Sequence, residues 1–198
     1  WCNKCEEETT RPEVKYMPKG SIMWGCKACD FDICQKCYDD ENVQAVNIDD
    51  EKIVNSILEL TKQMKTQTPM ILAVGRLVAR KGDMTLIRAM PKILEQHPGA
   101  RLVIIGRGHM KKRLLKNAKK LGIENAVFIQ SSMSFEDLAQ HFRSADLVVY
   151  PSYYEGQGLI PLESLASGTP VVTVNQAPLT EMVDLTVGDL FQSGDSND

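Results

Sequence analysis

The alternation of short apolar runs with amphipathic helical patterns constrains the fold of this chain most strongly. Five apolar runs are short enough to be buried strands, at residues 70–74, 102–105, 127–129, 147–150 and 171–174. Four helical patterns separate them, at residues 82–96, 110–121, 135–144 and 159–167. Strands that alternate with helices form parallel sheets through crossover connections. The pattern therefore predicts an α/β fold with a Rossmann-like open parallel sheet.

Local signals predict where these helices begin, end and bend. Ser134 with Asp137 three residues later is typical of a helix start, and Gly122 is typical of a helix end. Pro91 lies inside the first pattern and is expected to kink or split that helix.

All six cysteines lie in the first 37 of 198 residues, arranged as three C-x2-C pairs. A C-x2-C turn allows two thiolates to bind one tetrahedral zinc ion, whereas the alternative is a disulfide staple. Since the rest of the chain has no cysteine, a reducing compartment and a structural zinc module at residues 1–40 are favoured. We therefore expect a cytoplasmic protein. The expected ligands are Cys2, Cys5, Cys26, Cys29, Cys34 and Cys37.

The run of residues 24–37 resembles the zinc fingers of the ZZ type and of the diacylglycerol-binding type. The resemblance implies a cross-brace, in which Cys2, Cys5, Cys34 and Cys37 share one zinc ion. Cys26 and Cys29 would then belong to a second site that needs further ligands, or they would instead complete the first site. Either arrangement implies an interaction module with a possible protein partner.

Residues 41–68 are predicted to be a linker that contains one amphipathic helix. Ile53, Ile57, Leu60 and Met64 recur at helical spacing, after an acidic start at residues 49–51. The linker would lead into the α/β domain, at residues 69–198.

Charge and hydropathy argue against nucleic-acid and membrane-spanning functions. Residues 1–45 carry nine acidic and six basic side chains, which does not suit a phosphate backbone. The basic run at residues 111–120 keeps an intact apolar stripe, so it is interpreted as a solvated helix face. No apolar stretch approaches the roughly 20 residues of a membrane span.

The loop after the first predicted strand places two cations next to a helix start. Gly75 allows a tight exit from the strand, and Arg76 and Lys81 follow in the sequence G-R-x4-K-G. Fixed positive charge together with helix N–H groups suits a diphosphate. The run 106–109 also contains two glycines, but it lacks the third glycine of a dinucleotide fingerprint and follows the second strand.

The segment after the fourth predicted strand reads PSYYEGQGLIPLE, followed by SGTPVV at residues 167–172. Its two glutamates, Glu155 and Glu163, resemble the E-x7-E signature of retaining GT-B glycosyltransferases of the glycogen-synthase and sucrose-synthase type. Between them lie Gly156, Gly158 and Leu159, and the glycines allow backbone amides to approach a ligand closely.

The resemblance implies a role for each of these residues. Arg76 and Lys81 would neutralise the departing diphosphate, Glu155 would contact the donor sugar, and Glu163 would hold the ribose hydroxyls. The expected catalytic residues are Glu155, Arg76 and Lys81. The expected donor-binding residues are Gly75, Arg76, Lys81, Glu155, Gly156, Gly158, Leu159 and Glu163.

The function that the resemblance implies is hexose transfer, with retention, from a nucleotide diphosphate sugar to an unknown acceptor and without a catalytic metal. GT-B enzymes have two Rossmann-like halves, and this chain is expected to supply the donor half and to lack the N-terminal half. The alternative is a non-catalytic sugar-nucleotide-binding module whose zinc finger recruits a protein partner. A second Rossmann-like domain in a longer protein would favour the enzyme.

Overall fold

The computed structural model describes residues 50–64 and 68–192. The chain divides into two units, Trp1–Ala45 and Val46–Asp198, and every described residue belongs to the second. The predicted zinc module lies outside the described residues, so its zinc site remains a prediction.

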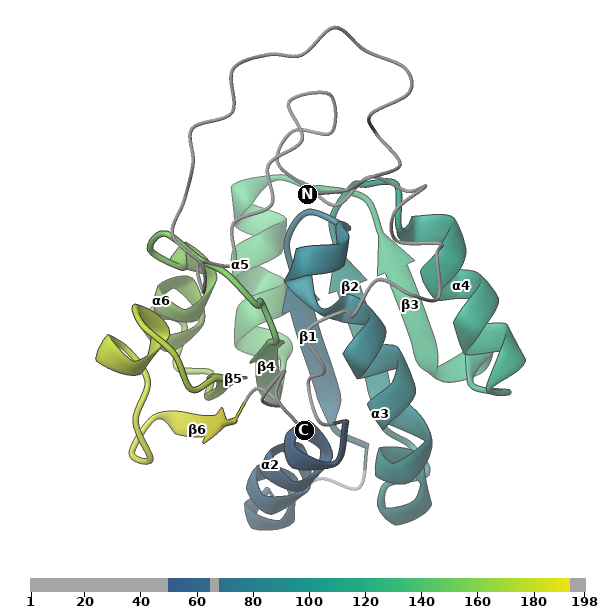
Figure 1. The fold of residues 1–198 in the computed structure, drawn as a ribbon, viewed down its shortest axis with the longest axis horizontal. Helices are drawn as coiled ribbons and strands as arrows, with labels where there is room; N and C mark the ends of the chain where they lie inside the picture. Colours follow the sequence, from purple (N-terminus) through teal and green to yellow (C-terminus); the bar gives the residue numbers. More distant parts are fainter. Residues whose placement is uncertain (1–49, 65–67, 193–198) are drawn as a thin grey trace, which may run out of the picture. The chain divides into compact units, whose positions relative to one another are not determined.

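The second unit alternates strands and helices along most of its length (Figure 1). Its strands are β1 (Met70–Val74), β2 (Arg101–Ile105), β3 (Val127–Gln130), β4 (Leu147–Tyr150), β5 (Val171–Val174) and β6 (Gly188–Phe191). Its α-helices are α2 (Asp50–Gln63), α3 (Asp83–Gln96), α4 (Lys111–Lys120), α5 (Phe135–Ser144) and α6 (Leu159–Ala166). Short 3-10 turns lie at η3 (Ala79–Lys81), η4 (Glu124–Ala126) and η5 (Leu179–Glu181).

The strands form one six-stranded sheet in the order β3-β2-β1-β4-β5-β6. Every neighbouring pair is parallel, with Leu72 opposite Val103 on one side of β1 and opposite Val148 on the other. The chain moves outward from β1 to β3, then returns and continues from β4 to β6. The strand order therefore reverses between β1 and β4, which is where open α/β sheets bind ligands.

Helices cover both faces of this sheet (Figure 1), with α2, α3 and α4 on one face and α5 and α6 on the other. Successive strand residues point to opposite faces, so both sets must be apolar. In β1, Leu72 packs with Phe142 of α5, and its neighbours Ile71 and Ala73 are buried on the opposite side. This two-sided core explains why the strands are continuous apolar runs in the sequence.

The five predicted strands are confirmed to within one residue, and a sixth strand was missed. This strand, β6, covers Gly188–Phe191, a segment for which no strand was predicted from the sequence. Gly188 and Asp189 disfavour strands by intrinsic propensity, but pairing with β5 overrides it. A Cβ on Gly188 would lie 1.9 Å from the Val171 carbonyl oxygen, so the close pairing requires glycine there.

The local signals in the helices are largely confirmed. The Ser134 side chain accepts a hydrogen bond from the Asp137 N–H at 3.1 Å, and Gly122 adopts a left-handed φ of 71° after α4. The prediction that Pro91 could split its helix is wrong, since α3 is continuous from Asp83 to Gln96. Buried Leu86, Ile87, Met90 and Ile93 flank the proline, and their packing offsets the lost hydrogen bond.

The amphipathic helix predicted near residue 53 forms α2, which packs against α3 and β6. Ile53 and Ile57 are fully buried, as their spacing indicated. The buried stripe continues through Val54, Leu58 and Thr61, whereas Leu60 and Met64 are only half-buried. This helix therefore completes one of the two apolar layers on the sheet.

Candidate functional site

Two loops meet where the strand order reverses, one after β1 and one after β4. The Tyr153 N–H donates a hydrogen bond to the Arg80 carbonyl at 2.9 Å. Gly82 has a left-handed φ of 73°, and a Cβ there would lie 2.1 Å from the Pro151 carbonyl oxygen. Glycine at position 82 is therefore required both by its backbone conformation and by the contact between the loops.

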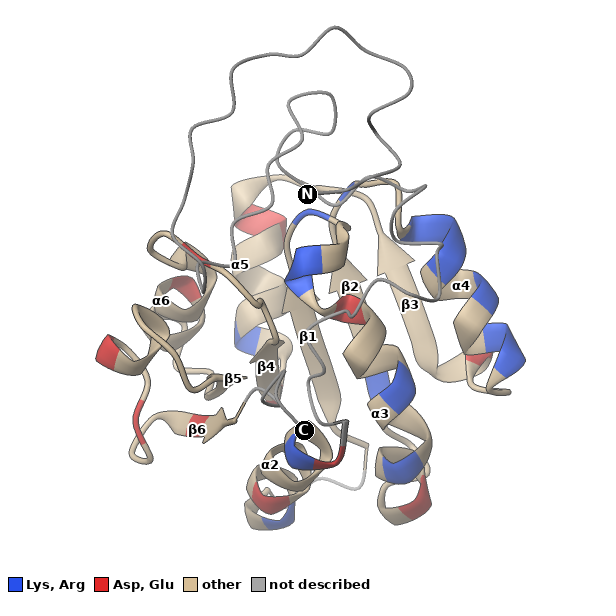
Figure 2. Cartoon of the chain, viewed as in Figure 1, with Lys and Arg blue, Asp and Glu red and all other residues tan. Residues whose placement is uncertain are grey.

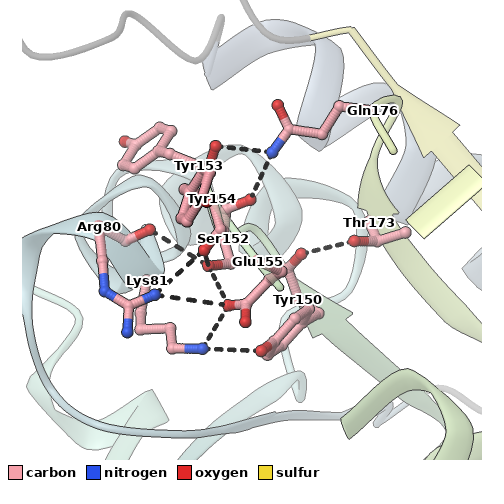
Figure 3. Close-up of polar contacts among 9 residues, drawn as sticks. All are labelled: Arg80, Lys81, Tyr150, Ser152, Tyr153, Tyr154, Glu155, Thr173 and Gln176. Carbon is pink, nitrogen blue, oxygen red and sulfur yellow. Dashed lines mark hydrogen bonds and ion pairs between the residues drawn. The ribbon is translucent and has the colours of Figure 1, made fainter. Parts of the chain in front are cut away.

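Lys81 and Glu155 come from these different loops and form an ion pair (Figure 3). The Lys81 ammonium also donates to the Tyr150 hydroxyl at 2.7 Å and lies 4.9 Å from the centre of that ring. Arg80 lies 4.0 Å from the same Glu155 oxygen and donates to the Tyr154 carbonyl at 3.1 Å. The Lys81 and Glu155 side chains are only 12% and 10% exposed, so solvent screens the pair weakly.

The pKa values of this pair are set by burial and by mutual interaction. Burial lowers the Lys81 pKa, although Glu155 opposes this effect. Burial alone would raise the Glu155 pKa, but hydrogen bonds from Lys81, Ser152 and Tyr150 outweigh it and the pKa lies below the ordinary value. Glu155 is therefore a carboxylate at neutral pH and can accept hydrogen bonds from hydroxyl groups.

Three further polar side chains hold the β4 loop in place (Figure 3). Ser152 is fully buried, donates to the Glu155 carboxylate and lies 3.3 Å from the Arg80 carbonyl oxygen. Gln176, after β5, donates to the Tyr153 carbonyl at 2.6 Å, and Thr173 donates to the Tyr150 carbonyl at 2.8 Å. These bonds fix the position of Glu155 relative to β5.

The β1 loop is held from its other side by the loop after β2. The Gly75 N–H donates to the Ile105 carbonyl at 3.0 Å, and the Leu77 N–H donates to the Arg107 carbonyl at 2.9 Å. Cβ atoms on Gly106 and Gly108 would lie 1.8 Å and 2.2 Å from the carbonyl oxygens of Gly75 and Leu77. The two glycines of the 106–109 run thus allow close backbone packing. Arg76 is exposed at this position, and its charge acts on Lys81.

The remaining predicted donor-binding residues lie at the start of α6. Gly158 precedes the helix with a left-handed φ of 76°, Gly156 is exposed, and Leu159 is 56% exposed. Glu163 lies in the second turn of α6, where partial burial raises its pKa. Its side chain is more exposed than that of Glu155, which leaves it open to an incoming ligand.

Sequence reasoning missed several polar residues of this cluster, among them Tyr150, Ser152, Gln176 and Asp83. Tyr150 ends β4, and the carboxyl ends of parallel strands face the ligand side of the sheet. The place of Tyr150 at the end of a predicted strand could therefore have identified it as a candidate site residue. The roles of Ser152 and Gln176 depend on contacts with carbonyl groups of the β4 and β1 loops, which no spacing in the sequence reveals.

Residues 50–64 and 68–192, which the structure describes, lack two features. No helix there is long and apolar enough to cross a membrane. The same residues hold no group of three or more histidine, cysteine and acidic side chains that could bind a metal ion.

These features define a doubly wound α/β domain with a charged cluster at its switch point, a class that binds nucleotides at this edge. The chain belongs to the family described as glycosyl transferases group 1, whose model matches residues 57–198. This result confirms the expected C-terminal domain of a GT-B glycosyltransferase.

Individual relatives agree with the family. An uncharacterised glycosyltransferase of Methanocaldococcus jannaschii is 43% identical over 122 residues, which cover 62% of this chain and 31% of that protein. The glycogen synthase of Mycobacterium tuberculosis is 36% identical over 122 residues, covering 62% of this chain and 30% of that enzyme. The chain thus spans about a third of the length of these relatives.

Among solved structures, the sucrose-phosphate synthase of Thermosynechococcus elongatus superimposes with a TM-score of 0.58 at 28% identity. The match covers 71% of this chain and 37% of that one. The chain is therefore similar in both fold and sequence to one domain of a larger synthase.

Proposed function

We propose that this domain binds a nucleotide diphosphate sugar at the carboxyl ends of β1 and β4, as the donor site of a retaining E-x7-E glycosyltransferase. The observation that carries the proposal is the Lys81–Glu155 pair, which joins a partly buried cation and a partly buried carboxylate at the switch point. The cation suits the diphosphate, and the carboxylate suits the hydroxyls of the hexose. The glycogen synthase similarity supports the same reaction class.

The proposal gives each side chain a role. Lys81, with the exposed Arg76 nearby, would hold the diphosphate and stabilise its charge as the bond to the hexose breaks. Glu155 would exchange part of its bonding to Lys81 for hexose hydroxyls. Glu163, on the first turns of α6, would accept hydrogen bonds from the ribose. The expectation that no catalytic metal is needed remains a prediction.

Calorimetric titration of the 198-residue chain with UDP, ADP and GDP tests donor binding. We expect at least one to bind, and Arg76→Ala and Lys81→Ala each to weaken that nucleotide by about 1–3 kcal/mol through loss of a charged hydrogen bond. Glu163→Ala should weaken the matching nucleoside as well, since its target is the ribose. Lys116→Ala in α4 is the matched control for removing one positive charge, and unfolding curves should show that each variant folds.

We further propose that donor binding and transfer are separable in this chain. Transfer requires an acceptor hydroxyl about 3–3.5 Å from the reacting carbon and a cleft that excludes water. Within the described residues, the cluster at the switch point lies on one sheet edge, and the chain spans about a third of its relatives. We expect the 198-residue chain to bind a donor without measurable transfer, and a protein that adds the acceptor-binding half to turn over with retention.

Product analysis by NMR decides this second proposal. A product with the same anomeric configuration as the donor supports retention, and inversion contradicts it. Turnover at an ordinary enzymatic rate by the 198-residue chain alone would show that one domain forms the whole active site.

For the N-terminal cysteines we propose structural zinc, supported by three C-x2-C pairs within residues 2–37. Elemental analysis of protein purified without chelators should find at least one zinc ion per chain. A zinc content near zero with oxidised thiols would contradict this proposal without affecting the donor site.

A further inference from the structure

A buried carboxyl group lies next to the candidate donor site without a role in the scheme above. Asp83 is the first residue of α3, two positions after Lys81, and the residue is buried, with 8% of its surface exposed. Its Oδ2 atom has no hydrogen-bond partner within the part of the chain that the structure describes. A buried carboxylate oxygen without a donor is costly, so such groups usually have a reason to be there.

The charged neighbours of Asp83 are the same groups that form the site. Lys81 in η3 acts on it electrostatically, and Asp83 in turn acts on Tyr150 at the end of β4. Glu155 and Arg80 act on Lys81 and Tyr150 from the surrounding loops. On the β4 loop, the Tyr153 hydroxyl oxygen lies 3.4 Å from the hydroxyl oxygen of Thr85, which is in the first turn of α3. The Lys81 ammonium therefore forms an ion pair with Glu155 and also acts electrostatically on Asp83.

Burial and charge compete at this position. The start of α3 and the Lys81 ammonium both favour the carboxylate form. Burial is the larger effect and raises the pKa of Asp83 to about 7. Asp83 is thus divided between its neutral and charged forms near neutral pH, whereas Glu155 is held as a carboxylate by its hydrogen bonds.

We propose, on the basis of the donor site described above, that Asp83 is a proton-linked positioning residue whose protonation increases when an anionic nucleotide binds at Lys81. A diphosphate at Lys81 adds negative charge beside Asp83 and competes for the ammonium that partly balances it. The carboxylate form then becomes less favourable, and a proton from solvent neutralises it. Protonated Asp83 leaves Lys81 to the diphosphate, whereas charged Asp83 would compete for it.

Linkage fixes the sign of the pH effect. Below pH 6 Asp83 is already neutral and binding takes up almost no proton at this residue. Above pH 7 the proton must be acquired on binding, so affinity falls as pH rises. If a bound nucleotide raises the Asp83 pKa by at least one unit, the change from pH 6 to pH 8 weakens binding about five- to tenfold through this residue.

The test uses the 198-residue chain and whichever of UDP, ADP and GDP binds most tightly. Titrations at pH 6, 7 and 8 compare the parent protein with Asp83→Asn, which has the shape of the neutral acid but cannot ionise. We expect the Asp83→Asn variant to match the parent at pH 6 and to bind about five- to tenfold more tightly at pH 8. The nucleotide's own phosphate titration affects both proteins equally and cancels in the comparison.

A second measurement needs no variant. Titrations of the parent protein at pH 8 in HEPES and in Tris, whose ionisation heats differ, give the number of protons bound. We expect uptake of a fraction of a proton, and none in Asp83→Asn. Zero uptake by the parent, or the same pH dependence in both proteins, would overturn the proposal. If none of the three nucleotides binds at pH 6, the donor-site proposal itself fails.

Discussion

The basic residues of helix α4 and the single residue Lys81 differ in their exposure to solvent and in their bonding partners. Much of helix α4 is coloured as Lys and Arg in Figure 2, and its Lys112, Lys116, Lys119 and Lys120 are exposed. Lys81 is a single cation, 12% exposed and bonded to Tyr150 and Glu155. The sequence makes α4 the more conspicuous feature, since six of its ten residues are basic.

We infer from the difference that burial, rather than the number of charges, distinguishes Lys81 as the proposed functional cation. The α4 lysines stand opposite buried Leu114 and Ala118, so their side chains point into solvent, where charge interactions are screened. Lys81 is desolvated, which lowers its pKa and strengthens its interaction with a ligand.

Lys81→Ala should have the largest effect on the folded domain. It leaves the Glu155 carboxylate partly buried without its main cationic partner, which should destabilise the domain by about 3–5 kcal/mol. Urea unfolding monitored by circular dichroism measures this. Lys81→Met, which retains most of the apolar stem, separates loss of packing from loss of charge. If the free energy of unfolding changes by less than about 1 kcal/mol in both variants, Lys81 contributes no more than a solvated lysine of α4, which would contradict the contrast.

Asp83→Asn should change the pH dependence of stability. The folded-state pKa is raised from 3.8 to about 7, so the folded protein binds the proton more tightly than the unfolded chain. The free energy of unfolding therefore decreases as pH rises from about 4 to about 7. About 2–3 kcal/mol of this decrease occurs above pH 5. Unfolding curves at pH 5 and pH 8 should show this loss in the parent protein and little of it in the variant. Parallel losses in both proteins would contradict the burial effect.

Ser152→Ala should have an intermediate effect. It removes a buried hydroxyl that bonds to Glu155 and lies near the Arg80 carbonyl, at an expected cost of about 1–2 kcal/mol. Because Glu155 loses a donor, its pKa should rise. Thermal unfolding measures the change in stability. The matched control is Ser167→Ala, which removes an exposed hydroxyl that donates to a backbone carbonyl at the end of α6. Equal effects of the two changes would argue that Ser152 does not position Glu155.

Lys116→Ala in α4 should have the smallest effect. An exposed lysine on a solvated helix face contributes within about 0.5 kcal/mol, and its removal should leave nucleotide affinity unchanged. The same titrations and unfolding curves measure both quantities. A tenfold loss of nucleotide affinity would reverse the comparison between the two basic groups.

Much of the fold could be predicted because its signals are local. Continuous apolar runs predicted strands β1 to β5, and Ser134 and Gly122 predicted helix ends, since each depends on residues near in sequence. Strand β6 was missed because Gly188 pairs through tertiary contact with Val171 rather than through strand propensity. The disruptive effect of Pro91 on its helix was overestimated because long-range packing of α3 outweighs one missing hydrogen bond.

For the site, the sequence supplied the residue types but not their partners. Gly75, Arg76, Lys81 and the E-x7-E glutamates stand out by their spacing. The contacts of Lys81 with Tyr150 and of Ser152 with Arg80 join residues about 70 positions apart, and they depend on the reversal of strand order between β1 and β4. Asp83 was not singled out from the sequence, because an acidic residue is common at a helix start and its burial cannot be deduced there.

The most direct test of the donor site is a crystal structure of this protein with the tightest of UDP, ADP and GDP. We predict that a diphosphate oxygen lies within hydrogen-bond distance, about 3 Å, of the Lys81 ammonium, with the ribose at Glu163 and the β1 and β4 loops around the phosphates. A nucleotide bound on the α4 face, with the Lys81–Glu155 pair unchanged, would contradict the central claim that the partly buried cation at the switch point is the functional one.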